Sequence, residues 1–336
     1  MIQPHDTEKS KEEQKMSNWN LPPKGGYMEA PKKMYYQTMT KLDVEERLKK
    51  DDVIIIPVGS TENHGAAGPI GEDTFMVTRI AEMVAEKTGC TVAEPFWYGS
   101  HPFHHIGQPC TIPLPDSVFI DMLRAVITGF WNTGFRKQIF ISLHGQEYSL
   151  PVALQEWGKK YQVPAMLYFV DIPRVMGQTL MDKAHGGPYD RPFQHACEAE
   201  QSLSLALFPE LCQQDKAENT ETKGFLPAGH VDRGGDIYGY PIPGHCQVGN
   251  CGIECVTFPE GVLGHAKDAD PKKAVASIEK TCDYLVKLHD DILKAFPAGQ
   301  LPPAELMSQR DPEEIEKLLK GPLKGGKHIY TLGWPT

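Results

Sequence analysis

The run Val53-Ile-Ile-Ile56 constrains the fold most, because four consecutive apolar, β-branched residues indicate a buried strand. Gly59 ends this strand, and Glu62 and His64 follow it directly. In an open α/β sheet, ligands bind where strands end and loops begin. The sequence therefore places a carboxylate and an imidazole where chemistry is expected.

Strand-like and helix-like segments alternate along the rest of the chain. Such alternation implies right-handed βαβ units and an α/β fold with a mostly parallel sheet. Short apolar runs predict three further strands, at 91–97, 138–143 and 165–170. Apolar residues at helical spacing predict helices over 40–50, 73–89, 116–134, 195–207 and 271–296, and another around Leu154 and Trp157.

The overall composition narrows the class of protein. A net charge of −10 argues against nucleic acid or an anionic membrane surface as the main partner. No apolar run approaches the roughly 20 residues of a membrane span, and the N-terminus lacks the apolar core of a signal peptide. Eight cysteines in 336 residues do not make a disulfide framework. These properties favour a cytoplasmic enzyme or binding protein.

The residues after the first strand offer donors for a metal ion. Glu62, His64 and Asp73 form an oxygen and nitrogen set that suits Zn, Mn or Fe better than Mg or Ca. An equally open alternative is that Asp73 caps a helix while Glu62 and His64 lie in a solvated loop. This stretch alone does not decide between the two.

Two further segments carry the same residue types. His144 follows the strand predicted at 138–143, as Glu62 follows the first strand. If residues 195–207 are helical, His195 and Glu198 lie three positions apart and share one face. Two metal ions a few Å apart share one hydroxide, lower its pKa and polarise the carbonyl that it attacks. The pattern therefore predicts a dinuclear centre.

Three stretches resemble the signature motifs of the creatininase-type amidohydrolases. Residues 57–65 with Asp73 resemble the first motif, and residues 134–145 resemble the second. Residues 195–202 read His-Ala-Cys-Glu-Ala-Glu-Gln-Ser, which resembles the family's His-Ala-Gly-Glu-x-Glu-Thr-Ser. The motifs occur in the family's order and span about residues 40–210.

The resemblance implies a three-layer α/β/α creatininase-like fold with two divalent metal ions per chain, Zn or Mn with Fe as a further option. It also implies a homohexamer. Asp73 is expected to bridge the ions, and His195 to be the catalytic proton shuttle, with Glu198 as a second catalytic residue. The metal ligands implied are Glu62, His64, Asp73, His144 and Glu198.

The resemblance also sets the expected domains. Residues 31–297 are predicted to form the creatininase-like hydrolase domain, and within it the irregular stretch 209–270 is expected to be a functional loop region. The polar residues 1–30 are predicted to be a flexible N-terminal arm. Residues 298–336, rich in Pro, Gly and Lys, are predicted to be a C-terminal surface extension.

The sequence departs from the family pattern near His144. In creatininase a glutamate two residues after this histidine is a metal ligand, whereas this chain has Gln146. The ligand role is therefore expected to pass to Glu198. Cys197 and Gln201 stand where the third motif has Gly and Thr, and these changes weaken the case for creatinine as substrate.

The loop over residues 99–113 indicates a branch of the family. Its His-Pro-Phe-His-His sequence resembles the branch that hydrolyses diketo-inositols such as 3-dehydro-scyllo-inosose. In that reaction a metal-bridging hydroxide attacks one carbonyl and the carbon–carbon bond breaks, and His195 is expected to protonate the carbanion. The three loop histidines have a plainer alternative as a polar surface loop. The substrate-binding residues expected are His101, His104, His105, Gln108, Gln146, Glu147 and Arg233.

Several alternatives remain at this level. A creatinine-like cyclic amide or a formamide is the second choice of substrate, and a non-catalytic sugar- or metal-binding protein is the alternative from another class. Cys246, Cys251 and Cys255 fit no standard zinc or iron–sulfur spacing, so buried thiols under a glycine-rich loop are favoured over a metal there. The best prediction is a diketo-inositol hydrolase of inositol catabolism.

Overall fold

The computed structural model describes residues 33–221, 225–227 and 252–330. Its centre is a parallel sheet with the strand order β2-β1-β3-β4. The predicted α/β class with a mostly parallel sheet is confirmed. The strands are β1 (Val53–Pro57), β2 (Thr91–Val92), β3 (Lys137–Ser142) and β4 (Met166–Asp171).

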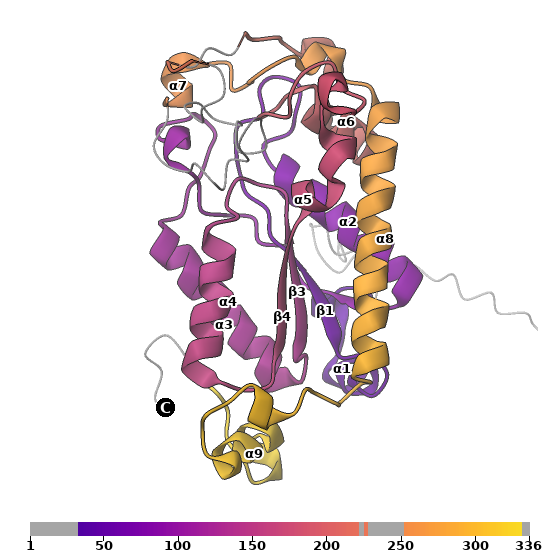
Figure 1. Cartoon of the computed structure of the whole chain (residues 1–336), viewed down its shortest axis with the longest axis vertical. Coiled ribbons are helices and arrows are strands. Elements are labelled where there is room, and N and C mark those ends of the chain that lie inside the picture. The colour runs from indigo at the N-terminus through magenta and orange to yellow at the C-terminus, as the bar shows by residue number, and fades with distance from the viewer. Residues whose placement is uncertain (1–32, 222–224, 228–251, 331–336) are drawn as a thin grey trace, which may run out of the picture.

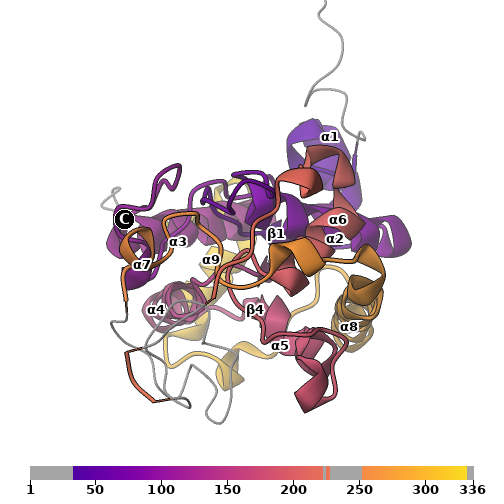
Figure 2. The same cartoon turned by 90° about the horizontal axis from the view of Figure 1, so that it is seen from above.

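Alternate side chains of β1 point into two different cores, which gives the molecule three layers (Figure 1). Val53 and Ile55 pack in the core under α2 (Glu72–Thr88), α6 (Glu198–Leu207) and α8 (Pro271–Ala295). Ile54 and Ile56 pack in the core under α3 (Asp116–Thr133) and α4 (Ser149–Tyr161). Figure 2 shows the two groups of helices on opposite sides of the sheet. Both faces are covered, so the strand is a continuous apolar run without polar alternation.

The helices begin and end close to the positions that the sequence signals predict. Thr40 and Asp43 form a capping box at the start of α1, and α2 ends at Gly89, which has a φ of 79°. The helices are α1 (Lys41–Leu48), α2 (Glu72–Thr88), α3 (Asp116–Thr133), α4 (Ser149–Tyr161), α5 (Ile172–Met176), α6 (Glu198–Leu207), α7 (Glu254–Thr257), α8 (Pro271–Ala295) and α9 (Pro312–Lys320).

The second strand is shorter than predicted. A strand was expected over 91–97, but the ladder is regular only over Thr91–Val92. Pro95 has no N–H to donate, so it interrupts the ladder. The chain still follows the end of β1, because the Phe96 amide donates to the Pro57 carbonyl at 3.0 Å.

Helix α6 begins three residues later than predicted. A helix over 195–207 was expected to place His195 and Glu198 on one face, and this expectation is wrong. Ala196 has a φ of 50°, outside the right-handed helical region, and Cys197 is the N-cap residue. His195 therefore lies in the loop before the helix, and its direction is independent of the helix faces.

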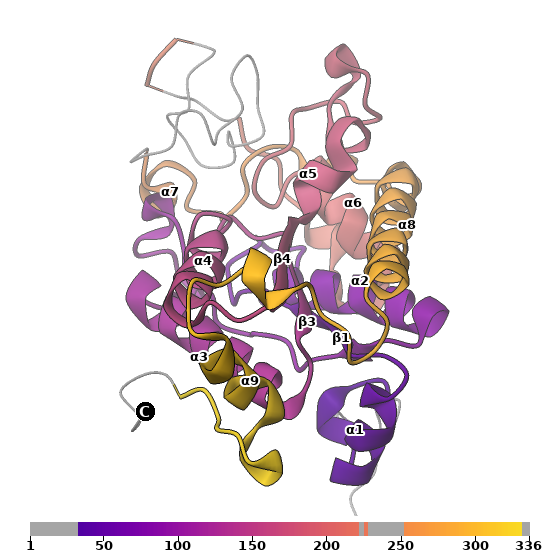
Figure 3. The ribbon, with the colours of Figure 1, turned by 60° about the horizontal axis from the view of Figure 1, so that its bottom comes forward.

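The described part of the C-terminal segment packs against the α3/α4 layer. Ile315 and Leu318 of α9 are buried in that core, and Figure 3 shows α9 beside the lower end of α3. The predicted flexible arm, residues 1–30, lies outside the described residues. Among the helices described, none has both the length and the apolarity needed to cross a membrane.

Gly59 allows α2 to approach the end of β1. A Cβ at this position would lie 2.4 Å from Thr74 Cα and 2.6 Å from Thr74 N, and backbone atoms in a packed helix do not move aside easily. Gly59→Ala is therefore expected to reduce the free energy of unfolding by about 1–3 kcal/mol, measured by urea denaturation. It should also displace Asp73, which precedes Thr74.

Gly129 in α3 provides the matched control, because a Cβ there meets no atom within 4 Å. Gly129→Ala is expected to be neutral or to stabilise the protein by up to about 1 kcal/mol. Equal unfolding free energies for the two variants would contradict the close packing of Gly59 against α2.

Candidate metal centre

Four of the five predicted metal ligands lie together at the carboxyl ends of the central strands. Glu62 and His64 follow β1, His144 follows β3, and Asp73 lies in the first turn of α2. Each of these side chains is at least 95% buried. The chain leaves the sheet after Pro57 in β1 and after Ser142 in β3. The polar side chains therefore converge beyond the carboxyl ends of these strands.

One group of potential ligands surrounds Glu62, and we call it the first cluster: Glu62, His101, His105 and His144. Oε2 of Glu62 lies 2.8 Å from His144 Nδ1, and Oε1 lies 3.0 Å from His105 Nδ1. His101 Nδ1 lies 3.1 Å from His105 Nδ1. Four donor atoms therefore converge from three separate loops.

A second group lies on the other side of Asp73, and we call it the second cluster: His64, Glu72 and Glu200. Its three ligand atoms lie within 4.8 Å of one another. Asp73 stands between the clusters, with Oδ2 at 3.2 Å from His144 Nδ1 and Oδ1 at 3.8 Å from His64 Nε2. Asp73 is thus in a position to serve both clusters, as a bridging carboxylate would.

Glu198 is not part of either cluster, although it was the fifth predicted ligand. Its Oε1 pairs with Lys273 of α8, and its Oε2 accepts a hydrogen bond from the Asp190 amide at 2.8 Å. Glu200, two residues later in the first turn of α6, lies beside His64 instead. The later start of α6 explains the difference, because it changes which glutamate faces the sheet edge.

His195 lies between the two clusters and is oriented by the backbone. Its Nε2 donates to the Asn63 carbonyl at 2.6 Å, so this nitrogen carries a hydrogen. Its Nδ1 lies 3.5 Å from Glu62 Oε1 and 3.9 Å from Glu200 Oε2. The ring therefore presents Nδ1 to the carboxylates.

Burial and charge act against each other in the first cluster. Burial alone would raise the pKa of Glu62, but the surrounding imidazoles, those of His195 and His144 among them, outweigh it and hold the pKa well below its usual value. Burial alone would lower the pKa of His144, but Glu62 and Asp73 raise it well above its ordinary value. The carboxylate thus stays ionised in a buried place.

The loop imidazoles and Glu72 behave differently. Burial lowers the pKa of His101 and that of His105 to about 3, so both rings are neutral at physiological pH and keep a lone pair for a metal. Burial, with a smaller contribution from Glu200, raises the pKa of Glu72 to about 8 against the attraction of His64. His195 has its pKa raised to about 10, since Glu62, Glu254 and Glu200 outweigh its burial.

Buried carboxylates and imidazoles make both clusters fit for metal ions. All four side-chain oxygens of Glu62 and Glu72 are buried, and the groups that face Glu62 are the imidazole nitrogens of His105 and His144. Buried carboxylates are costly unless they are paired or coordinate a metal. Imidazole and carboxylate donors at these spacings are the set that Zn, Mn and Fe prefer.

The other predicted substrate-binding residues differ in their surroundings and in their hydrogen bonds. His104 and His105 are buried beside Glu254, whereas the Gln108 side chain is buried and forms no hydrogen bond within the described chain. Gln146 Nε2 donates to the Gly59 carbonyl at 3.1 Å. Glu147, the next residue in the sequence after Gln146, is half-buried.

Some of the predicted residues cannot be placed. Arg233, Cys246 and Cys251 lie outside the described residues. Cys255 donates from Sγ to the Ile106 carbonyl at 3.2 Å, and none of the metal-ligand groups found among the described residues includes it.

Three acidic residues at the site were not predicted. Glu72 stands next to Asp73 and could have been noticed as a second carboxylate at the helix start. Glu200 is part of the third motif, where only the assumed helix start directed attention to Glu198. Glu254 lies within the irregular stretch 209–270, and nothing in its local sequence distinguishes it from a solvated glutamate.

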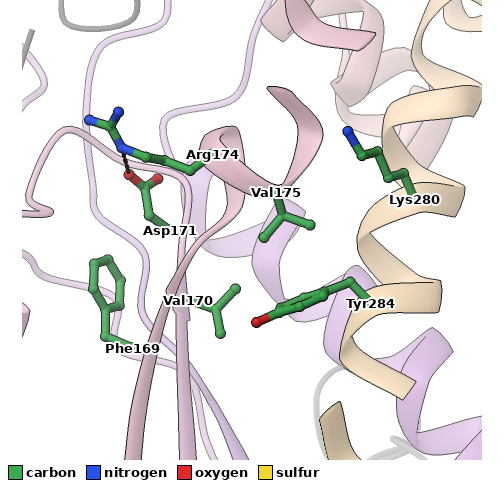
Figure 4. Close-up of a pocket in the computed structure, with 7 residues that line it drawn as sticks. All are labelled: Phe169, Val170, Asp171, Arg174, Val175, Lys280 and Tyr284. Atoms are coloured by element: carbon green, nitrogen blue, oxygen red, sulfur yellow. Dashed lines mark hydrogen bonds and ion pairs between the residues drawn. The ribbon is translucent and has the colours of Figure 1, made fainter. Parts of the chain in front are cut away.

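A separate groove lies between β4, α5 and α8, with a volume of about 410 Å³ (Figure 4). It is lined by apolar side chains of β4 together with Lys280, Tyr284 and the Arg174–Asp171 ion pair. It shares no residue with the two clusters. The chemistry is therefore expected at the clusters and not in this groove.

Comparison with known sequences gives one family. The family model described as "Creatininase: Creatinine amidohydrolase" matches residues 37–289. The chain is 54% identical over 307 residues to a protein of Thermotoga maritima named 3-dehydro-scyllo-inosose hydrolase, covering 91% of this chain and 99% of that protein. It is 25% identical to the creatinine amidohydrolase of Pseudomonas putida over 58% of this chain and 80% of that enzyme.

Solved structures show the same fold. A structure titled "Creatininase Mn" matches with a TM-score of 0.59 at 20% identity, covering 80% of this chain and 99% of that chain. A mutant creatininase titled "Zn-Zn type" matches with a TM-score of 0.58 at 20% identity, covering 81% of this chain and 100% of that chain. At this identity the likeness is one of fold, and it agrees with the three-layer arrangement described above.

Proposed function

The chain belongs to the creatininase family, and from that premise we propose that this hydrolase opens 3-dehydro-scyllo-inosose, a cyclic diketo-inositol, in inositol catabolism. The observation that carries the proposal is the 54% identity to a protein of that name, which extends over 99% of that protein's length. The loop 99–113, with its three histidines at the sheet edge, lies within the chain length that this similarity covers.

We propose two divalent metal ions, Zn or Mn with Fe as a further option. Glu62 and His144 hold one ion, His64 and Glu200 hold the other, and Asp73 binds both. Glu200 takes the ligand role that the sequence alone assigned to Glu198, because its carboxylate lies beside His64. Ions bound there would lower the pKa of a water molecule and polarise a substrate carbonyl.

A side chain of the protein must then deliver a proton to the leaving carbon. Hydrolysis adds water across the bond between a carbonyl carbon and its neighbour: the oxygen joins the carbonyl carbon, the carbon–carbon bond breaks, and the neighbour takes a proton. The second ketone of the substrate stabilises the carbanion that leaves. We assign delivery of that proton to His195 Nδ1, because Nε2 is held by the Asn63 carbonyl.

A polyol also needs hydrogen-bonding partners in its pocket. Nε2 and Oε1 of Gln108 and Oε2 of Glu147 are three buried atoms that make no hydrogen bond to a described residue. We propose that these groups and His104 contact substrate hydroxyls. Arg233 stays a prediction on the sequence alone.

The first experiment is a turnover screen on metal-loaded protein with a diketo-inositol, creatinine and formamides as substrates. Ring opening of the diketo-inositol with about two metal ions per chain is the expected result. Cleavage of amides alone would move the substrate to the second choice, which the creatinine amidohydrolase relative supports. Metal or sugar binding with no turnover on any of them would leave a binding protein.

His195→Ala is expected to lower kcat by about 10²–10⁴-fold, the contribution of a positioned proton donor. Metal content should stay at the wild-type level, because His195 is not among the proposed ligands. His185→Ala is the control, since His185 pairs with Asp182 away from both clusters. A His195→Ala variant with wild-type kcat would show that another group delivers the proton.

The homohexamer and the cytoplasmic location remain predictions. Light scattering after size-exclusion chromatography measures the first, and a mass near that of a monomer would contradict it. Cell fractionation measures the second.

A further inference from the structure

The first cluster contains more imidazoles than the proposed ligand set uses. Glu62, His144 and Asp73 supply three ligands, and the residue two positions after His144 is Gln146, whose amide is a weak ligand for Zn or Mn. Gln146 is also engaged elsewhere, because its Nε2 donates to the Gly59 carbonyl at 3.1 Å and to Ser142 Oγ at 3.2 Å. Part of the coordination shell of this ion is therefore still to be assigned.

The spacing of the cluster's donor atoms is close to the spacing of ligands around one ion. Ligand atoms about 2.0–2.1 Å from a zinc ion with five ligands lie roughly 2.9–3.6 Å apart where they are neighbours. Glu62 Oε1 lies 3.0 Å from His105 Nδ1, which lies 3.1 Å from His101 Nδ1. A single ion can therefore contact these atoms after only small side-chain movements.

Glu254 of α7 faces the other side of the His105 ring. His105 Nε2 lies 3.5 Å from Glu254 Oε2, and His104 Nε2 lies 3.6 Å from Oε1. Glu254 is fully buried, and neither of its oxygens makes a hydrogen bond to a described residue. A histidine that binds a metal through one nitrogen usually donates the hydrogen on its other nitrogen to a carboxylate, which fixes the ring.

We propose that His101 and His105 bind the first metal ion through Nδ1, in addition to Glu62, His144 and Asp73, and that Glu254 positions His105. The inference rests on the proposed metal centre and adds ligands to it. It also changes the role of two residues that the sequence assigned to substrate binding. His105 is only 4% exposed and sits between Glu62 and Glu254, so it is enclosed by protein groups on both nitrogens.

The wild-type protein gives the first test without any substitution. X-ray absorption at the zinc edge of protein loaded with two zinc ions counts the imidazoles around the metal. His144, His101 and His105 on one ion and His64 on the other give about two imidazoles per zinc, whereas His144 and His64 alone give about one. A count near one would overturn the proposal, whatever the activity of the sample.

Variants identify which residues are responsible. Metal-free protein is titrated with Zn²⁺ alone, and bound zinc is measured by mass spectrometry. His105→Ala is expected to weaken binding of one ion at least 100-fold while the second cluster keeps its ion, so a folded variant holds about one zinc per chain. Glu254→Gln is expected to weaken the same ion about 10–100-fold, as loss of an orienting carboxylate does.

His185→Ala is the matched control and should bind zinc as the wild type does. The ion retained in the second cluster shows that each variant is folded. Two tightly bound ions in both His105→Ala and Glu254→Gln would overturn the proposal while the proposed function stands. A wild-type protein that binds no metal would instead overturn the proposed function itself.

Discussion

Glu200→Gln is expected to remove one metal ion and abolish measurable turnover, whereas Glu198→Gln leaves both ions in place. Glu200 lies beside His64 in the second cluster, and loss of a ligand should weaken metal binding at least ~100-fold. Glu198 instead pairs with Lys273 and accepts from the Asp190 amide. Its substitution should reduce the unfolding free energy by about 1–3 kcal/mol and leave kcat near that of the wild type.

The two variants differ by two positions in one helix and remove the same charge, so each controls for the other. Bound metal per chain, measured after gel filtration, and kcat on the diketo-inositol are the readouts. Loss of metal in Glu198→Gln with retention in Glu200→Gln would restore the ligand assignment made from the sequence.

Asp52→Ala is expected to reduce the free energy of unfolding by about 3–5 kcal/mol, the largest stability effect that we expect from one residue. Lys137 of β3 is fully buried, and its Nζ lies 2.7 Å from Asp52 Oδ1. The variant leaves that ammonium with the carbonyls of Phe296 and Pro297 and no counter-charge. The Gly299 amide also loses its acceptor, since its nitrogen donates to Asp52 Oδ2 at 3.1 Å in the native protein.

Urea denaturation measures this effect, and Glu45→Gln is the control. Glu45 pairs with Lys41 on the exposed side of α1, where a lost ion pair changes the unfolding free energy by no more than about 0.5 kcal/mol. A change below 1 kcal/mol in Asp52→Ala would contradict the importance of the buried pair. Metal content should not change, because Lys137 begins the six-residue strand β3 and the clusters lie beyond its other end, about 20 Å away along the chain.

The sequence predicts the layers of the fold well, because that information is local. The apolar run at 53–56 and the amphipathic spacing in 271–296 each depend on neighbouring residues. The parallel sheet follows from their alternation. Where a local exception occurs, the prediction is less accurate: Pro95 shortens β2, and the positive φ of Ala196 delays α6.

The site is predicted only in part, for a physical reason. Glu62 and His144 come directly after strands, so their positions follow from the sheet. To choose Glu200 over Glu198, one must know at which residue the helix begins, and sequence patterns give that residue only to within a few positions. Glu254 comes from a segment remote in sequence, and its burial depends on tertiary packing that no local pattern records.

All side chains of β1 and β3 are buried, whereas the members of both clusters come from loops after strands or from the first turns of helices. Selection therefore acts on two separate sets of positions. Inherited changes in the strands are removed when they unfold the protein, whatever its substrate. Substitutions at the cluster positions leave the apolar strands unchanged, so an architecture of this kind allows the substrate to change with little effect on the stability of the sheet.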